Sequence, residues 1–466
     1  MRDIQILVPP FEFHSLTKVE IHKTANEHFT ACIQGTIQQN QVKDYSHIAA
    51  TEQFCAIKAK IQDEKNNKEE TLFVGLLENL SLQSYAEYTE LEIRLISATY
   101  LLDLSPHLRV FQNPEQKVTD LVKSICTTYG KTTCLFAISD ELKLNRFVVQ
   151  YAESDWVFLK RLASLYQLML IPNDSHEGLN LSFGLFFPPH KEISISPTEG
   201  TWKRQSSRKR KKEAYGLEPD HELEFHFSSR DYYPIMQKLK VQKQSVWIFA
   251  SHSVYEGGEL IHYYECRPQK GWDAFKRENT SFAGLSLAAR VQEVSNDMVK
   301  IKVENDENFS APCRWFTYST PYSAMNGTGW YSMPEIEDEV RLVFPNLKEN
   351  ESYVLSSVHL PTASSDRKNP DFKSWKTKYG KEILFTPDSI VIHNNNKTSI
   401  TIKDNEGIIL ETPNDIKIQA KKDVSLESKE GSVLIQAKEK VDIKQSKIGI
   451  CIDDDITFIN GKLDMQ

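Results

Sequence analysis

Long apolar runs are missing from this sequence. No stretch approaches 18 consecutive apolar residues, the length that a membrane-spanning helix needs, although 40% of the chain is hydrophobic. The N-terminus, MRDIQILVPPFEF, also lacks an apolar run behind a basic patch. Because a secretory signal needs both features, we expect no signal peptide and assembly in the cytoplasm.

Paired cysteines and an excess of basic residues are missing too. The net charge of −8 and the pI near 6.0 argue against nucleic acid as a partner. The cysteines are odd in number, scattered and without a CxxC pair, so we predict neither a disulfide framework nor a zinc site. They are Cys32, Cys55, Cys126, Cys134, Cys266, Cys313 and Cys451.

Catalytic motifs are equally scarce. The sequence has no HExxH and no GxxxxGK[ST], and GLSLA at 284–288 falls short of the GxSxG elbow because Ala288 replaces the second glycine. We therefore predict a protein that is not an enzyme, with no catalytic, cofactor-binding or metal-binding residues.

One strongly basic run stands out against the acidic background. KRQSSRKRKK, residues 203–212, could bind nucleic acid or an anionic surface, or act as a localisation signal. No aromatic residues that could stack on bases are interleaved with it, which favours a solvated loop.

The last part of the chain has few aromatic residues but a regular repeat. Residues 380–466 contain no Trp, Tyr or Arg and only two Phe. Apolar residues two apart recur there, and successive pairs begin 10, 8, 8, 8, 9, 8, 7 and 8 residues apart. The alternation predicts short strands, and the longer period predicts a repeat architecture with a thin core. The pairs are Ile390/Ile392, Ile400/Ile402, Ile408/Leu410, Ile416/Ile418, Val424/Leu426, Val433/Ile435, Val441/Ile443, Ile448/Ile450 and Ile456/Phe458.

These strands need neighbours that a single chain does not supply. Three strands per coil would give one chain roughly 14 Å of prism, whereas three interwound chains give roughly 43 Å at about 4.8 Å per strand. Short solenoids with open ends are poor cores, so we predict a homotrimer with an intertwined trimeric β-helix. Its predicted core residues are Ile400, Ile402, Ile408, Leu410, Ile416, Ile418, Val424, Leu426, Val433, Ile435, Val441, Ile443, Ile448 and Ile450.

The first half of the chain mixes strands with two amphipathic helices. Residues 114–128 space Val118, Leu121, Val122 and Ile125 three and four apart, which predicts a helix with one buried face. Residues 147–170 predict a strand, FVVQY, followed by a helix that Ser154 and Asp155 begin.

Residues 282–359 change to short strands with close turns. LAARVQEVSNDMVKIKVEND predicts two strands joined at Asn296 and Asp297, and PCRWFTY, GWYSMP, DEVRLVFPN and YVLSSVH predict four more. This pattern is typical of a small OB-fold barrel. The predicted fold is mainly β with an α+β hub, in four parts. These are a hub at 1–275, an OB-fold barrel at 276–362, a linker at 363–378 and a needle at 379–466.

Three motifs in this order resemble the VgrG-type spike proteins of contractile injection systems and related phage tail hub proteins of the late control D-like family. RFVVQYAESDWVFLKRLAS (146–164) is similar to the hub signature. GTGWYSMPEIEDEVRLVF (327–344) is similar to the barrel signature, and YGKEILF (379–385) to the start of the needle. The resemblance implies two similar hub β-barrels per chain.

Carried over by position, the hub motif is implied to have a packing role. Its residues are Tyr151, Glu153, Ser154, Asp155, Trp156, Arg161 and Leu162. In the barrel motif, Met333 and Pro334 occupy the positions where the family pattern has Ile-Pro. Asp338, Glu339 and Val340 match the Asp-Glu-Val of that pattern. Two departures put turn conformations in doubt: Glu337 replaces the usual glycine, and 346–353 (NLKENESY) replaces a Gly-Asp-rich turn.

The resemblance implies a trimeric hub beneath a hexameric tube, driven with its needle through a target membrane when a sheath contracts. The implied partners are the tube protein, baseplate components, a PAAR-like tip protein and effectors. The implied location is a particle assembled in the bacterial cytoplasm and delivered outside the cell or into a target cell. The needle ends in unpaired backbone, so we predict that a tip protein covers it through Ile456, Phe458 and Ile459.

Two alternatives stay open at this point. Asp453, Asp454 and Asp455 could serve as acids of a spike that degrades envelope polysaccharides, although consecutive residues on a strand point to alternating faces. A receptor-binding tail fibre would share the trimeric needle but should end in an aromatic-rich knob.

Overall fold

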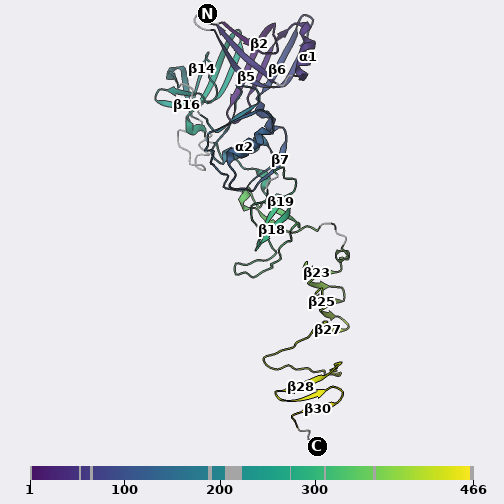
Figure 1. The fold of residues 1–466 in the computed structure, drawn as a ribbon. Helices are drawn as coiled ribbons and strands as arrows, with labels where there is room; N and C mark the ends of the chain where they lie inside the picture. Colours follow the sequence, from purple (N-terminus) through teal and green to yellow (C-terminus); the bar gives the residue numbers. More distant parts are fainter. Residues whose placement is uncertain are drawn as a thin grey trace. The chain divides into compact units, whose positions relative to one another are not determined.

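The computed structural model describes residues 3–51, 54–62, 67–186, 192–204, 223–272, 274–308, 311–359, 361 and 364–461. It divides into two compact units, Met1–Leu360 and Pro361–Gln466. The chain is mainly β, as predicted (Figure 1). None of the helices in the described ranges has the length and apolar character that crossing a bilayer requires.

A 12-stranded sheet dominates the first unit. Its strands run in the order β1-β4-β5-β6-β3-β2-β16-β17-β14-β13, with β15 paired to β16 and β12 paired to β15. They are β1 (Asp3–Leu7), β2 (Ser15–Thr24), β3 (Thr30–Ile37), β4 (Phe54–Gln62), β5 (Asn67–Ser84), β6 (Thr89–Ile96), β12 (Ile193–Ile195), β13 (Gly200–Arg204), β14 (Leu223–Ser229), β15 (Lys238–Val241), β16 (Gln244–Glu256) and β17 (Glu259–Arg267).

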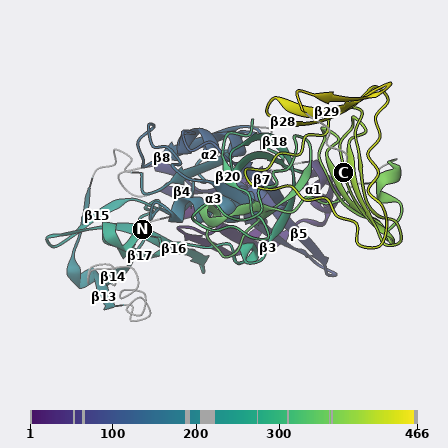
Figure 2. The same ribbon diagram turned by 90° about the horizontal axis from the view of Figure 1, so that it is seen from below.

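The antiparallel pairing of β2 with β16 joins the two halves of this sheet. Ser253 on β16 faces Ile21 on β2, more than 200 residues away in the sequence. In Figures 1 and 2 the purple strands of the first half therefore run beside the teal strands β14, β16 and β17. Two separate hub barrels stay a prediction.

A smaller α/β core follows within the first unit. Helices α2 (Val118–Thr127) and α3 (Asp155–Ser164) pack with the sheet β10-β11-β8, and α1 (Val42–Thr51) belongs to the large-sheet half of the unit. Both helices predicted from the sequence are confirmed, and the four spaced residues of α2 are all buried. The strands here are β7 (Pro106–Phe111), β8 (Thr132–Phe136), β9 (Val148–Ser154), β10 (Leu170–Pro172) and β11 (Leu179–Phe183).

A five-stranded antiparallel sheet completes the first unit in the order β20-β19-β18-β21-β22. Its strands are β18 (Ser286–Ser295), β19 (Met298–Val303), β20 (Phe316–Thr317), β21 (Glu339–Val343) and β22 (Tyr353–Leu355). The predicted turn at Asn296 and Asp297 is confirmed. The prediction of a strand at GWYSMP is wrong: residues 329–334 form a loop in which Trp330 and Tyr331 are exposed. An OB-fold closure of this sheet stays a prediction.

The second unit contains two antiparallel meanders. The first comprises β23 (Lys373–Lys376), β24 (Glu382–Phe385), β25 (Ser389–His393), β26 (Ser399–Lys403) and β27 (Gly407–Glu411). The second comprises β28 (Val441–Gln445), β29 (Ile448–Ile452) and β30 (Ile456–Ile459). Residues 412–440 between them form no strand in the single chain.

Candidate functional sites

The hub motif surrounds the start of α3. Ser154 has extended backbone, and its hydroxyl accepts a hydrogen bond from the Val157 amide at 3.2 Å, which confirms it as the N-cap. The same hydroxyl donates to Asp103, the last residue of the 3-10 helix Ala98–Asp103, which lies 51 residues earlier in the chain. Ser154 therefore caps the first turn of the helix and ties it to this distant segment.

Asp155 is a fully buried carboxylate at the first position of α3. The Gln150 amide donates to its Oδ1 at 2.8 Å, the Tyr129 hydroxyl donates to its Oδ2 at 2.7 Å, and Arg109 forms an ion pair with it. Burial, with this contact to the carboxylate, raises the pKa of Tyr129. A buried charge is stable when it is paired and hydrogen-bonded in this way, so Asp155 acts as a structural centre.

Arg161, Glu153 and Glu349 form a second buried network, here called the hub joint. Arg161 is 3% exposed and binds Glu153 through two contacts of 2.8 Å. Its remaining nitrogen donates to Glu349 Oε1 at 3.0 Å, and Glu349 also accepts from the Val149 amide. Burial opposes the charge of Arg161, but the carboxylates outweigh it and raise its pKa. The hub joint ties α3 to the segment before β22, 188 residues away.

The other hub-motif residues are packing elements. Trp156 is 2% exposed, and its ring lies 4.4 Å from the ring of His28, whose pKa is lowered by burial. Leu162 is fully buried, whereas Tyr151 is half-buried and packs against the core of the five-stranded sheet. The structure thus brings the hub-motif residues together around the start of α3.

Glu337 occupies a glycine-like conformation in the barrel motif. Its φ of 71° lies in the left-handed region, where a side chain is strained. Its amide donates to Val291 O at 2.8 Å, and Asp338 Oδ2 accepts from the Glu335 amide at 2.9 Å. Glu337 therefore adopts a backbone conformation that glycine reaches more easily.

Two apolar rows cross the first meander of the second unit, here called the needle rows. The register aligns Ile392, Ile400 and Leu410 in one row, and Ile390, Ile402 and Ile408 in the other. These side chains are 39% to 70% exposed, since a lone sheet leaves that face open. Ile383 and Phe385 on β24 extend the two rows.

The middle of the predicted needle core behaves differently. Residues 412–440 form no strand, and the predicted core residues there are 53% to 70% exposed. They are Ile416, Ile418, Val424, Leu426, Val433 and Ile435. A single chain offers them no partner strand, which is the physical reason for the difference from the predicted repeat.

The second meander contains the remaining core and tip residues. Ile443, Ile450 and Phe458 align across the three strands, and Val441, Ile452 and Ile456 form the neighbouring row. Ile448 faces Gln445 on β28. Ile459 pairs with Gly449, so it lies on the opposite face of β30 from Phe458. The three tip residues therefore do not share one surface in this sheet.

Asp453, Asp454 and Asp455 lie in the turn between β29 and β30, not on a strand as predicted. The Asp455 amide donates to Asp453 Oδ1 at 3.2 Å. Aspartate favours such turns because its carboxylate accepts a backbone N–H two residues on. Of the basic run 203–212, Lys203 and Arg204 end β13, and residues 205–212 lie outside the described residues.

Lys23 is a buried lysine that the sequence analysis does not identify. The alternation of buried and exposed residues along β2 places it on the inward face. Val19, Ile21 and Lys23 share the inward face, and Lys23 is 2% exposed. Its ammonium pairs with Asp174 at 2.5 Å and donates to Tyr232 Oη at 2.9 Å. Burial opposes this charge, but the Asp174 carboxylate outweighs it and raises the pKa of Lys23.

Comparison with known proteins identifies the fold. Residues 34–172, which include the hub motif, match the family described as the phage tail baseplate hub. The E. coli c3393 protein, a component of the type VI secretion system with structural similarity to T4 tail proteins gp27 and gp5, superposes with a TM-score of 0.53. The chain has the fold of a VgrG-type spike. That superposition has 14% identity and covers 75% of this chain and 99% of c3393.

Two PdpA–VgrG complexes share the VgrG-type fold. The Francisella half-lidded complex gives a TM-score of 0.57 at 10% identity, over 88% of this chain and 88% of that chain. The lidless complex gives 0.55 at 11% identity, over 88% of this chain and 98% of that chain. No curated protein matches the sequence.

Proposed function

We propose that this chain is the structural hub and spike of a contractile injection system and joins the tube to a membrane-puncturing needle. The fold shared with c3393 and the VgrG chains, together with the hub-family match, supports this role. The system is a type VI-like secretion system, an extracellular contractile particle or a phage tail. The work is mechanical, which agrees with a hub motif that consists of buried ion pairs and packing contacts.

The open needle rows carry the proposal that three copies assemble. An isolated sheet with a continuous apolar face is unstable in water, and exposed apolar surface of this extent marks an interface. Three chains cover one another's rows and give residues 412–440 the partner strands that one chain lacks. The closed ladder of such a prism has no lateral edges, which suits a shaft that must not peel apart.

Native mass spectrometry of the full chain tests this step. We expect one species near three times 53.6 kDa, about 161 kDa, which persists on dilution. Negative-stain micrographs should show a needle on the same particle. A stable species near 53.6 kDa would contradict the proposal.

The end of the needle is the proposed docking place for a PAAR-like tip protein and its effectors. Phe458 is 43% exposed at the last described strand, and an open strand end needs a cover. Deleting residues 456–466 should abolish tip and effector loading while the trimer mass is retained. Unchanged loading would refute this docking place and leave the spike role standing.

A further inference from the structure

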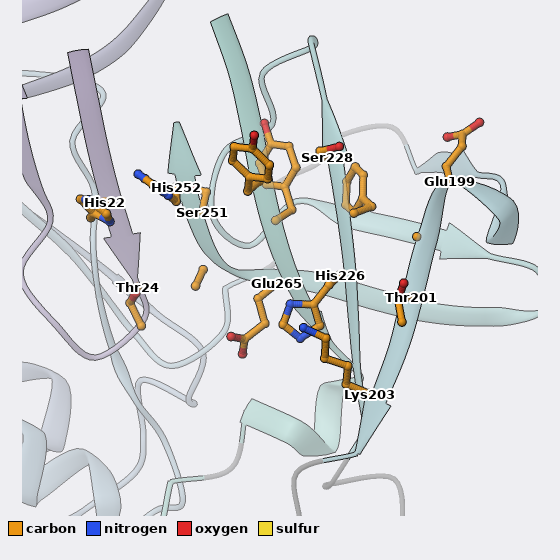
Figure 3. Close-up of a pocket in the computed structure, with 15 residues that line it drawn as sticks. His22, Thr24, Glu199, Thr201, Lys203, His226, Ser228, Ser251, His252 and Glu265 are labelled. Atoms are coloured by element: carbon orange, nitrogen blue, oxygen red, sulfur yellow. The ribbon is translucent and has the colours of Figure 1, made fainter. Parts of the chain in front are cut away.

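A groove of about 560 Å³ crosses one half of the large sheet, from the central strand β2 to the terminal strand β13. Figure 3 shows its lining, which comes from β2, β16, β17, β14 and β13. At one end, the imidazoles of His22 and His252 stack with centroids 4.1 Å apart. Farther along, His226, Glu265 and Lys203 project into the groove (Figure 3).

Three potential metal ligands meet on two paired strands. Glu224 and His226 lie two apart on β14 and so share a face, and Glu265 on β17 is the direct partner of His226. The ligand atoms of the three residues all lie within 4.8 Å of one another. The Glu224 carboxylate is fully buried, whereas the side chains of His226 and Glu265 are 28% and 24% exposed toward the groove.

The distance between His226 and Glu224 leaves room for a shared ion. His226 Nε2 lies 3.3 Å from Glu224 Oε2, which is longer than the usual N–H···O separation of about 2.9 Å. Two ligands of a tetrahedral ion, each bound at about 2.0–2.1 Å, are separated by about 3.3 Å. The pair is therefore spaced like one edge of such a site.

Arg267 holds the carboxylates in place beside this position. Its guanidinium stacks on Phe249, 3.4 Å from the ring centroid, and contacts Glu224 Oε1 at 3.0 Å and Glu265 Oε1 at 2.6 Å. The two carboxylates exceed this guanidinium by one negative charge, and Lys203, which projects into the same groove and pairs with Glu224 in the β13–β14 register, offsets that charge, so a dication must displace the Lys203 ammonium. Arg267 fixes the Oε1 side of Glu224 while Oε2 faces the imidazole.

We propose that Glu224, His226 and Glu265 bind a divalent transition metal of the zinc class, with water from the groove as a further ligand. Imidazole together with carboxylate selects such ions, whereas Ca²⁺ and Mg²⁺ prefer oxygen ligands alone. The ion fastens β14 to β17 next to β13, the terminal strand of the sheet. The sequence signal is the E-x-H alternation of a strand, which searches for CxxC and HExxH do not detect.

Co²⁺ titration of the full chain, with any affinity tag removed, tests the site. We expect one Co²⁺ per chain with the visible absorption of a tetrahedral complex, and displacement by Zn²⁺. His226→Gln should weaken binding by more than about 100-fold, because loss of an outer-shell partner alone costs about 10- to 100-fold. Circular dichroism checks that the variant is folded.

His252→Gln is the matched control, since it removes an imidazole from the same groove but not from the cluster. It should bind Co²⁺ like the wild type. Lys203 faces Glu224 across β13 and β14, so Lys203→Met removes a competing charge and should tighten binding. No stoichiometric Co²⁺ uptake, or equal uptake by the folded His226→Gln variant, would overturn the proposal and leave a cluster stabilised by Arg267 alone.

Discussion

Residues 1–360 and residues 361–466 differ in how far their apolar side chains are buried. In the first unit, three clusters bury the aliphatic and aromatic residues, and ion pairs such as Arg161–Glu153 are closed off from water. In the second unit, the needle rows lie open and residues 412–440 form no strand. The first unit buries its apolar residues within one chain, whereas the second leaves its apolar rows uncovered.

The largest expected effect comes from placing charge in the needle rows. Ile400→Lys with Ile402→Lys should reduce the native mass from about three chains to one, because the interwound core has no room for six ammonium groups. Thr401→Lys on the opposite face of β26 is the matched control and should keep the trimer mass. If the double variant stays trimeric, the needle rows are not the interface.

A substitution in the hub joint should lower the stability of the first unit but leave the trimer assembled. Arg161→Met leaves Glu153 and Glu349 without their cation and should lower the free energy of unfolding of the first unit by about 3–5 kcal/mol. Denaturant unfolding measures this change, and the trimer mass should persist below the transition. Arg290→Met breaks an ion pair whose side chains are 39% and 36% exposed and should cost less than about 1 kcal/mol. Equal losses of stability in both variants would show that the buried hub joint contributes no more than an exposed ion pair.

A smaller loss is expected at the start of α3. Ser154→Ala removes the N-cap bond and the contact with Asp103, and should cost about 1–2 kcal/mol in the same unfolding experiment. Ser124→Ala inside α2 is the comparison, because that hydroxyl only bonds back to Leu121 O. It should change stability by less than about 0.5 kcal/mol.

The smallest effect is a gain. Glu337→Gly removes the left-handed strain and should stabilise the first unit by about 0.5–1 kcal/mol after the greater chain entropy of glycine is subtracted. Glu335→Gly, two residues earlier without a positive φ, should destabilise it. A loss of stability in Glu337→Gly would show that the side chain, with its bond from Gln292, matters more than the backbone.

Features that depend on neighbouring residues could be predicted from the sequence. The cap at Ser154, the buried face of α2 and the turn at Asn296 and Asp297 each depend on residues within a few positions, so they could be predicted. The sequence predicts a strand at 329–334 because Trp330 and Tyr331 are residue types that favour strands, but the structure has an exposed loop there.

Contacts between distant residues could not be found in this way. Arg161 meets Glu349 across 188 positions, and Lys23 meets Asp174 through a fold that no local spacing encodes. The cluster of Glu224, His226 and Glu265 needs the β14–β17 register as well as the residue types. The needle rows were predictable as a repeat, but one chain does not contain the surface that we propose covers them.

Because residues 412–440 form no strand in one chain, the proposed assembly depends on how often three chains collide. If strands in this stretch form only when three chains meet, as proposed, the rate of shaft formation should rise steeply with chain concentration. Until then, the aliphatic residues of the stretch, such as Ile418 and Leu426, are exposed to water and could pair with the wrong partner. Charged residues such as Lys421, Lys422 and Asp423 interrupt the aliphatic residues at short intervals. Such charges oppose aggregation and keep the unassembled chain soluble.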